Sequence, residues 1–147
     1  MPLDVAALSG RQAYDLLIDC VVPRPVAWIL TLDPEGIPNL APFSFFNAAT
    51  ARPPTISVAV SAKPSEAGFV AKDTVRNLLH HGAFVVHLAT ALDAGAVSRS
   101  AEDFPAGTDV PAHLGLDLLP GAFGPIPRLA GAPVALELEW GLAGGDA

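Results

Sequence analysis

The chain of 147 residues is long enough for one domain with a sizeable core, and its 51% apolar and 16% charged residues exclude an intrinsically disordered protein. A formal net charge of −7 without any run of Lys or Arg argues against nucleic acid as a partner, because phosphate-binding proteins concentrate basic residues on one face. No apolar stretch approaches the roughly 20 residues that a membrane-spanning helix needs.

The cysteine content and the first twenty residues bear on the compartment. Cys20 is the only cysteine, so the sequence offers neither an internal disulfide nor a CxxC motif, as is typical of a reducing compartment. The first twenty residues lack the basic start and the continuous apolar segment of a secretory signal. We therefore expect a cytoplasmic protein that is not embedded in a membrane.

The first predicted elements are a helix and a β-hairpin. Apolar residues recur at helical spacing over residues 11–20, and Ser9 can cap the helix that this spacing predicts. After the segment VVPRP, residues 26–32 form a nearly unbroken apolar run, which indicates a strand covered on both faces. Residues 33–36, DPEG, fit a type I turn, and we expect a hairpin there.

The next two strands differ in pattern. The return strand of the hairpin contains Pro38 and Pro42, which remove ladder donors, so it must bulge, bend or lie at an edge. Residues 56–61, ISVAVS, alternate strictly and predict a strand with one apolar face.

A loop and a second helix follow. We interpret KPSEAGFVAKDT as a loop. Val75, Leu78 and Leu79 then lie at helical spacing, and Gly82 can end the helix, with a strand over residues 83–89 after it.

The last third alternates between irregular and regular segments. Residues 91–101 predict a short helix, and the six prolines from 104 to 133 predict a long irregular excursion with one helical turn near 112–114. Residues 133–140 alternate as a strand with Glu137 and Glu139 on its wet face. The whole pattern favours a mainly β fold, a small β-barrel with peripheral helices, and no GxGxxG or GxxxxGK[ST] motif supports a doubly wound sheet.

The start of the second helix is a candidate anion site. Asp73 or Thr74 can cap the helix, its first amides are free to donate, and Lys72 adds positive charge at an end that already favours anions. An ordinary capped helix beside a solvated lysine explains the same pattern.

The histidines and tryptophans indicate no catalytic or metal site. His80 and His81 suit the end of a helix, where a cation complements the dipole, and His87 fits a core or a groove. His113 has no partner at metal-ligand spacing, so we expect no metal and assign no catalytic residue. Trp28 and Trp140 are expected in the core or at an interface.

Taken in their order, the motifs PRPVAW, NLAPFSFFNA and KDT followed by Asn77 resemble the flavin reductase-like family of FMN-binding split barrels. The likeness runs from about Leu17 to Leu88 and continues more weakly through SAEDFPAGTDV to PVALELE. It implies one domain over residues 1–147, a six-stranded, Greek-key-like barrel that forms a homodimer, and FMN in a groove near the subunit interface.

The resemblance implies which positions hold the cofactor. Arg24 and Pro25 stand at the strand entry, residues 41–47 beside the ring and the ribityl chain, and the later positions at the phosphate. The candidates are Arg24, Pro25, Ala41, Pro42, Phe43, Ser44, Phe45, Asn47, Ser61, Lys63, Lys72, Asp73, Thr74 and Asn77. Arg24 is equally consistent with a surface charge, and at least one of Phe43, Phe45 and Phe46 with the core. At Lys63, where relatives often have a nearby arginine, a lysine keeps the charge but loses the bidentate fork.

The implied function is that of an FMN-dependent oxidoreductase that passes reducing equivalents from NADH or NADPH to flavin or another acceptor. The absence of a visible acid–base pair fits, because the cofactor carries the redox chemistry. The alternatives are an FMN-binding electron carrier without catalysis and a degenerate barrel without flavin. Relatives usually continue beyond PVALELEW into a further strand, whereas this sequence ends at GLAGGDA; either a tail is missing, or an open barrel edge makes dimerisation matter more than usual.

Overall fold

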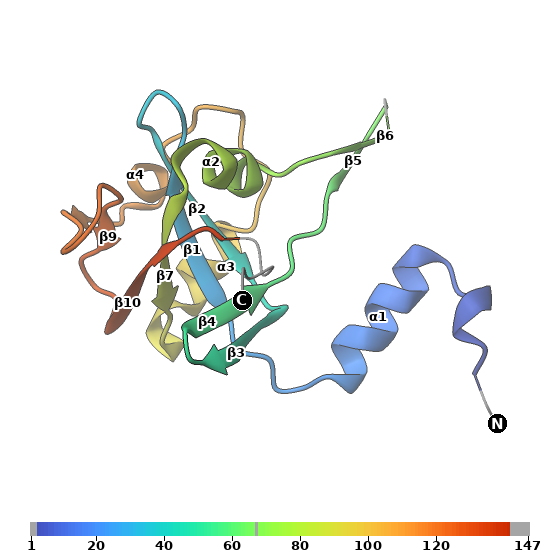
Figure 1. The fold of residues 1–147 in the computed structure, drawn as a ribbon. Helices are drawn as coiled ribbons and strands as arrows, with labels where there is room; N and C mark the ends of the chain where they lie inside the picture. The colour runs from blue at the N-terminus through green and yellow to red at the C-terminus, as the bar shows by residue number, and fades with distance from the viewer. Residues whose placement is uncertain (1–2, 67, 142–147) are drawn as a thin grey trace.

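The computed structural model describes residues 3–66 and 68–141. A four-stranded antiparallel sheet of order β10-β7-β1-β2 lies at its centre, surrounded by short helices and two-stranded ladders (Figure 1). The strands are β1 (Ala27–Leu32), β2 (Pro38–Phe43), β3 (Phe46–Ala51), β4 (Pro54–Val58), β5 (Lys63–Ser65), β6 (Gly68–Val70), β7 (Ala83–Leu88), β8 (Leu118–Leu119), β9 (Arg128–Leu129) and β10 (Val134–Glu139). The helices are η1 (Val5–Ala7), α1 (Gly10–Cys20), α2 (Asp73–His81), η2 (Ala91–Asp93), α3 (Ala94–Arg99) and α4 (Val110–Leu114). The mainly β fold with short helices is confirmed.

Strand β1 is covered on both faces, as its apolar run predicts. Trp28 and Leu30 point into one core cluster, and Ala27 and Ile29 point into the other, because successive side chains of a strand alternate between faces. All four residues are at most 2% exposed. β1 also pairs with β2 on one side and β7 on the other, so it is an interior strand of the sheet.

The hairpin between β1 and β2 is confirmed. The amide of Gly36 donates to the carbonyl oxygen of Asp33 at 2.9 Å, which closes the turn. The carboxylate of Asp33 also accepts from the amides of Glu35 and Ile37 at 3.0 and 2.7 Å. β2 is the last strand of the sheet, and this edge position accommodates its two prolines as expected.

One face of the sheet is covered by α2 and by the β3–β4 ladder. Ile56 and Val58 pack against the core cluster on this face, which includes Ile29, as the alternation predicts. The predicted strand covers residues 56–61, whereas β4 begins at Pro54 and ends at Val58. Gly82 ends α2 in the left-handed conformation with φ of 68°, as expected for a glycine at that place. The helical spacing predicts Leu79 on the buried side of α2 together with Val75 and Leu78. Leu79 is instead 67% exposed.

The buried side of α2 is partly polar. Thr74 and Asn77 are buried together with Leu78, and the amide of Asn77 donates to the hydroxyl of Thr31 on β1 at 3.0 Å. Neither Asp73 nor Thr74 caps the helix, so that expectation is wrong. The cap position is Lys72, whose side chain makes no capping hydrogen bond.

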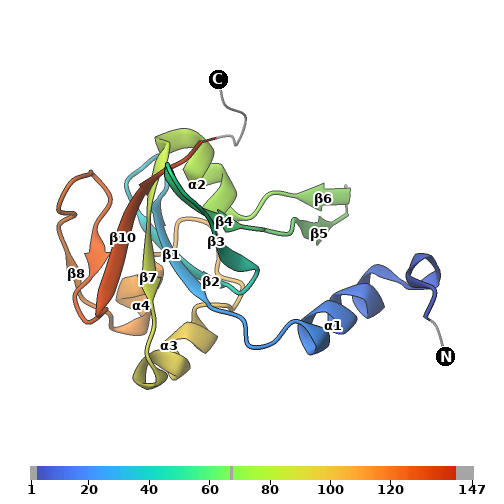
Figure 2. The same cartoon turned by 60° about the horizontal axis from the view of Figure 1, so that its bottom comes forward.

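The loop predicted between β4 and α2 is instead a hairpin. Strands β5 and β6 pair with each other from Lys63↔Val70 to Ser65↔Gly68. Figures 1 and 2 show this hairpin extending away from the sheet. Phe69 is 80% exposed on it, so the hairpin is held by its own ladder and buries little apolar surface.

Helix α1 also lies apart from the sheet in both views (Figures 1 and 2). Ser9 caps it in a capping box with Gln12, which confirms the predicted start. None of its residues is buried, and its free cysteine, Cys20, is exposed. In residues 3–66 and 68–141, no helix combines the length and the apolar content needed to cross a membrane.

The excursion after α3 covers the other face of the sheet. It contributes Val110, Leu114, Ile126 and Leu129 to the core cluster around Trp28. His87 fastens it, because its ring donates from Nδ1 to the carbonyl of Trp28 at 3.1 Å and accepts at Nε2 from the amide of Leu129 at 2.9 Å. The predicted helical turn is α4, and the short β8–β9 ladder was not expected.

Strand β10 pairs with β7 and is confirmed. Glu137 does more than line its wet face: its carboxylate accepts from the amides of Ala122, Phe123 and Gly124 at 2.6, 2.8 and 3.0 Å. These hydrogen bonds lower its pKa, since they stabilise the charged form. Trp140 is 47% exposed, so it is not a core residue. The expectation about an open edge after this strand concerns residues 142–147, which lie outside the described ranges.

Candidate functional site

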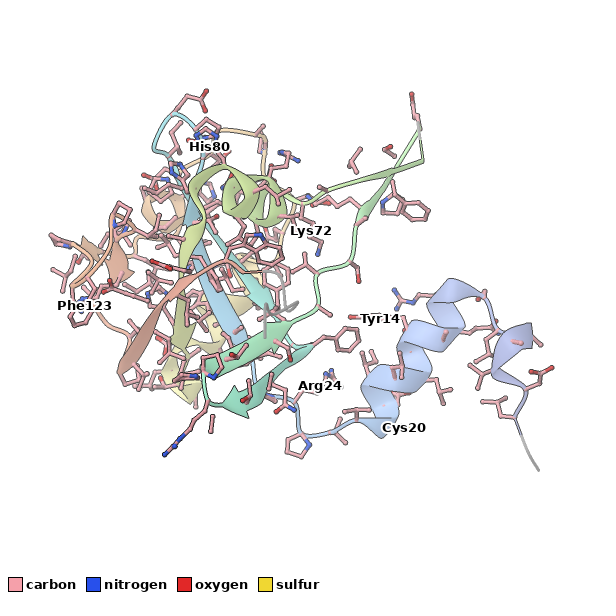
Figure 3. The ribbon with its side chains drawn as sticks, in the orientation of Figure 1. Tyr14, Cys20, Arg24, Lys72, His80 and Phe123 are labelled. Carbon is pink, nitrogen blue, oxygen red and sulfur yellow. The ribbon has the colours of Figure 1, made fainter. Side chains whose placement is uncertain are left out.

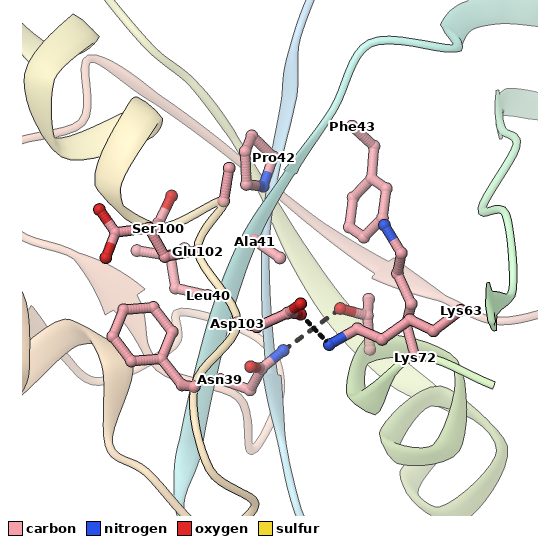
Figure 4. A pocket seen from close by; sticks show the side chains of 13 residues that line it. Asn39, Leu40, Ala41, Pro42, Phe43, Lys63, Lys72, Ser100, Glu102 and Asp103 are labelled. Atoms are coloured by element: carbon pink, nitrogen blue, oxygen red, sulfur yellow. Dashed lines mark hydrogen bonds and ion pairs between the residues drawn. The ribbon is translucent and has the colours of Figure 1, made fainter. Parts of the chain in front are cut away.

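A pocket of about 110 Å³ lies between the edge strand β2, the start of α2, and the segment that follows α3 (Figure 4). It is lined by residues 39–43 from β2, by Lys63, Lys72 and Thr74, and by residues 100–104. Its wall therefore joins segments that are far apart in the sequence.

The β2 wall is joined to α2 by a hydrogen bond. The side-chain amide of Asn39 donates to the hydroxyl of Thr74 at 3.2 Å, and Thr74 is 1% exposed. Because β2 is an edge strand, one side of its backbone faces away from the ladder, where a ligand can approach its peptide groups. Pro42 and Phe43 give this wall its apolar surface.

The second wall is positively charged. Lys72 precedes the first turn of the nine-residue helix α2, and its ammonium lies 5.5 Å from the centre of the Phe43 ring. Asp73 is paired with Arg76 rather than capping the helix. A helix start that lacks a side-chain cap and carries a lysine attracts anions, because its amides and its dipole present partial positive charge.

The third wall is acidic. Lys63, at the start of β5, forms an ion pair with Asp103 across the pocket (Figure 4). The hydrogen bond and the positive charge of Lys63 lower the pKa of Asp103. This segment begins at Ser100, which is 3% exposed and whose hydroxyl accepts from the indole of Trp28 at 2.9 Å.

Six of the candidate residues from the sequence line this pocket: Ala41, Pro42, Phe43, Lys63, Lys72 and Thr74. The proline-containing strand β2 and the amino end of α2 thus share one cleft within the chain. The structure does not place the other candidates there.

Arg24 and Pro25 line a second, larger cavity of about 520 Å³, formed with residues 88–90 and with α3. The guanidinium of Arg24 donates to the carbonyls of Ile18 and Val21 at 2.5 and 2.8 Å, and to the hydroxyl of Ser44 at 3.3 Å. Arg24 therefore joins the end of α1 to the turn after β2 (Figure 3).

The remaining candidates lie around these cavities. Phe45 packs against Tyr14 of α1, with ring centres 6.0 Å apart. Asn47 and Ser61 are exposed, and Asp73 is paired with Arg76. Asn77 is 4% exposed and bonded to Thr31, so it holds α2 on the sheet and does not reach the pocket.

Part of the lining was not among the residues predicted from the sequence. Asn39, Leu40 and residues 100–104 all contribute to the pocket. A signal for the second group was present in the pair Glu102 and Asp103, two adjacent acids. Nothing in the spacing indicates that they lie opposite Lys63, forty residues earlier.

The donor set fits the phosphate end of a flavin nucleotide. Two lysines and an uncapped helix start offer charge-assisted hydrogen bonds to a phosphate, and Phe43 with Pro42 offers apolar contact beside them. At about 110 Å³ the pocket is smaller than the roughly 300–1,000 Å³ of sites that enclose a whole ligand. It therefore has room for the phosphate end and not for the complete cofactor. Among residues 3–66 and 68–141, no three His, Cys, Asp or Glu side chains gather as metal ligands would.

The sequence and the fold are both similar to known proteins. The profile of the flavin reductase like domain family matches residues 19–140. The uncharacterized protein BH2278 of Halalkalibacterium halodurans is 38% identical over 139 residues, which cover 95% of this chain and 65% of that protein. The chain thus spans about two thirds of the length of this relative.

Three solved structures extend the comparison. Nitrilotriacetate monooxygenase component B from Bacillus cereus is 31% identical with a TM-score of 0.86, over 93% of this chain and 66% of that one. The 2-nitrobenzoate 2-nitroreductase NbaA of Pseudomonas fluorescens is 30% identical with a TM-score of 0.83, over 95% and 64%. A split barrel domain structure from Shewanella frigidimarina, at 15% identity, a TM-score of 0.76, and coverage of 95% and 68%, shows the same fold. The predicted split barrel is therefore confirmed.

Proposed function

Because the chain belongs to the flavin reductase-like domain family, we propose that it is an FMN-dependent oxidoreductase that passes reducing equivalents from NADH or NADPH to a flavin or another acceptor. The observation that carries this proposal is the pocket in which Lys63 and Lys72 lie beside the uncapped start of α2. A phosphate is the ligand that this combination of donors suits best.

In this proposal different residues of the pocket contact different parts of the cofactor. Lys63, Lys72 and the first amides of α2 hold the phosphate, and Ala41, Pro42 and Phe43 contact the part of the cofactor next to it. When bound, FMN supplies the redox chemistry, which explains why no acid–base pair is needed in the pocket. Ser44, Asn47 and Arg24 belong to the site only if the ring extends past the end of β2 toward α1.

The structural relatives with at least 30% identity support a redox role. One is named as a monooxygenase component and the other as a nitroreductase. The shared family and the similar fold extend to this chain the expectation of electron transfer, while the acceptor stays open. Assays with NADH and with NADPH identify the donor.

The proposal includes a homodimer. Helix α1 and the β5–β6 hairpin both extend from the sheet with exposed apolar side chains: Leu17 is 51%, Val21 54% and Phe69 80% exposed. A second copy that covered these segments would bury apolar surface and could complete the cofactor groove. Light scattering of the wild type and of a Leu17→Glu, Phe69→Glu variant tests this: the wild type should have twice the chain mass and the variant a single chain mass.

Absorption and turnover test the function itself. The purified protein, with and without added FMN, should show the shifted flavin bands of a bound cofactor, and it should then oxidise NADH or NADPH in the presence of free flavin under air. Bound flavin without nicotinamide oxidation would favour an electron carrier and reject the enzyme. A protein that gains neither flavin bands nor a thermal shift with FMN would be a barrel without cofactor.

A further inference from the structure

The charges that line the pocket cancel. Lys63 and Lys72 contribute two positive charges, and Glu102 and Asp103 contribute two negative ones. A site that only had to attract a phosphate would need the lysines and would be weakened by the acids. The acidic wall is therefore a feature that phosphate binding alone does not explain.

Asp103 already binds Lys63, one of the hydrogen-bond donors proposed to hold the phosphate. Its carboxylate is paired with the ammonium of Lys63, while the charge of Lys72 is close enough to lower the pKa of the same carboxyl group further. In Figure 4 the Asp103 carboxylate faces the ammonium of Lys63, and Lys72 lies on the same side as Lys63. It thus stands where an anionic ligand would meet the lysines.

The backbone on both sides of Asp103 is held in place. Ser100 is buried and bonded to Trp28, and Phe104 packs edge-on against the His113 ring with centres 5.2 Å apart. Between these two anchors the Asp103 side chain is 84% exposed, so its carboxylate can turn into solvent without disturbing the core. The segment keeps the acid near the pocket but does not lock it there.

We propose that Asp103 is an internal competitor for the phosphate: its carboxylate holds Lys63 until a phosphate displaces it. This inference rests on the proposed FMN site. A carboxylate and a phosphate use the same charge-assisted hydrogen bonds to an ammonium, and the phosphate, with nearly two negative charges, is the stronger partner. A flavin without a phosphate does not compete for Lys63, so Asp103 reduces the preference of the pocket for FMN over riboflavin.

The size of the effect follows from exposure. An exposed ion pair contributes little in water, so release of Lys63 should change phosphate binding by only about two- to fivefold, and salt should screen the effect. Asp103→Asn removes the charge and keeps the shape of the side chain. Glu102→Gln is the matched control, because it removes the same charge from the neighbouring residue, which forms no ion pair in the described part of the chain.

The experiment measures the Kd of FMN and of riboflavin by quenching of flavin fluorescence at low salt. Asp103→Asn should tighten FMN binding about two- to fivefold and leave riboflavin unchanged, Glu102→Gln should have a smaller effect, and 0.5 M NaCl should reduce both. In a Lys63→Met background the effect of Asp103→Asn should shrink, because the shared donor is gone. Unchanged or weaker FMN binding by Asp103→Asn would overturn the proposal.

A second probe separates this inference from the proposed function. Inorganic phosphate should raise the Tm of Asp103→Asn more than that of the wild type, whether or not the protein binds a flavin. If neither FMN nor riboflavin binds while this difference is found, the cofactor assignment fails and the competition stands. If FMN binds to the wild type and Asp103→Asn gains nothing for FMN or for phosphate, the competition fails and the cofactor assignment stands.

Discussion

The central sheet buries its apolar side chains, whereas the segments that project from it leave theirs exposed. In the sheet, Trp28, Leu30 and Val86 are at most 2% exposed. On α1 and the β5–β6 hairpin, which we call the projecting segments, Leu17 and Phe69 are more than half exposed. The sheet provides its own partners, whereas the projecting segments leave apolar surface for something else to cover.

The polar groups show the same contrast. Every buried side-chain nitrogen and oxygen in the described part of the chain has a hydrogen-bond partner, as with His87 between Trp28 and Leu129. The lysines of the pocket are instead paired with an exposed carboxylate or lie over an aromatic ring. The comparison teaches that stability resides in the sheet and that binding is expected at its edge and beyond it.

The strongest test of this division replaces one leucine by alanine in each of the two regions. Leu30→Ala should lower the free energy of unfolding by about 2–5 kcal/mol, because it leaves a cavity in the closed core. At protein concentrations low enough to keep the chains apart, Leu17→Ala should change it by less than about 0.5 kcal/mol, since this side chain buries little within one chain. Urea denaturation measures both. A large loss for Leu17→Ala at low protein concentration would break the comparison, whereas a loss that appears only as the concentration rises is expected if a second copy covers α1.

The next effect concerns the pocket. Lys72→Met should weaken FMN binding about tenfold, the loss expected when one charge-assisted hydrogen bond to a phosphate is removed. Its unfolding midpoint should stay near that of the wild type, because the contact of the ammonium with the Phe43 ring contributes only about 0.5–1 kcal/mol. Arg11→Met on α1, whose side chain is 80% exposed, serves as the control for net charge. Flavin fluorescence titration decides, and equal Kd values for the two variants would exclude Lys72 from the site.

A smaller effect should come from pH. Burial lowers the pKa of His87, and the charge of Arg128 lowers it further, although the bond to the Trp28 carbonyl opposes both. The unfolded chain takes up this proton near pH 6.5, and the folded chain only at lower pH. Stability is therefore complete above about pH 6.5 and decreases below it, by at most about 1.4 kcal/mol per pH unit.

Urea midpoints measured from pH 7.5 to pH 5 check this slope. The His87→Gln variant should be less stable at every pH and should lose most of the slope in this window. The carboxyl groups of Asp103 and Glu137 do not interfere, because their pKa values are lowered and they titrate at more acidic pH. Parallel curves for the variant and the wild type would remove His87 as the cause.

The smallest effect is expected at the turn before β9. Glu137→Gln takes away the charge that orders the amides of residues 122–124, and these amides should exchange with solvent faster. The Tm should fall far less than in Leu30→Ala, because the carboxylate is at the surface. Hydrogen exchange followed by NMR would show it. Unchanged protection of Phe123 would mean that the backbone of the turn is sufficient.

The sequence predicts best those elements whose local pattern agrees with their place in the sheet. The apolar run of β1, the alternation of β4 and the glycine after α2 each have one physical reading, and the structure confirms all three. The prolines of β2 allow a bulge, a bend or an edge position, and the strand lies at an edge. In these cases the tertiary surroundings strengthen a preference that the local sequence already has.

Other features could not be predicted because distant residues decide them. The β5–β6 hairpin lacks the alternating apolar pattern of a buried strand, since almost nothing covers it. Thr74 and Asn77 point inward on α2 only because Asn39 and Thr31 offer them partners. The acidic wall of the pocket could not be predicted for the same reason, because the partner of Asp103 is Lys63, on another segment.

The exposed thiol of Cys20 at the end of α1 allows a direct measurement of whether two chains assemble. As the sole cysteine of the sequence, it directs a nitroxide label to one position without any substitution. In a twofold assembly, two such labels would give one interspin distance by pulsed electron resonance, and a lone chain would give none. The line shape of the same label would report whether the helix tumbles freely or is clamped against a neighbour.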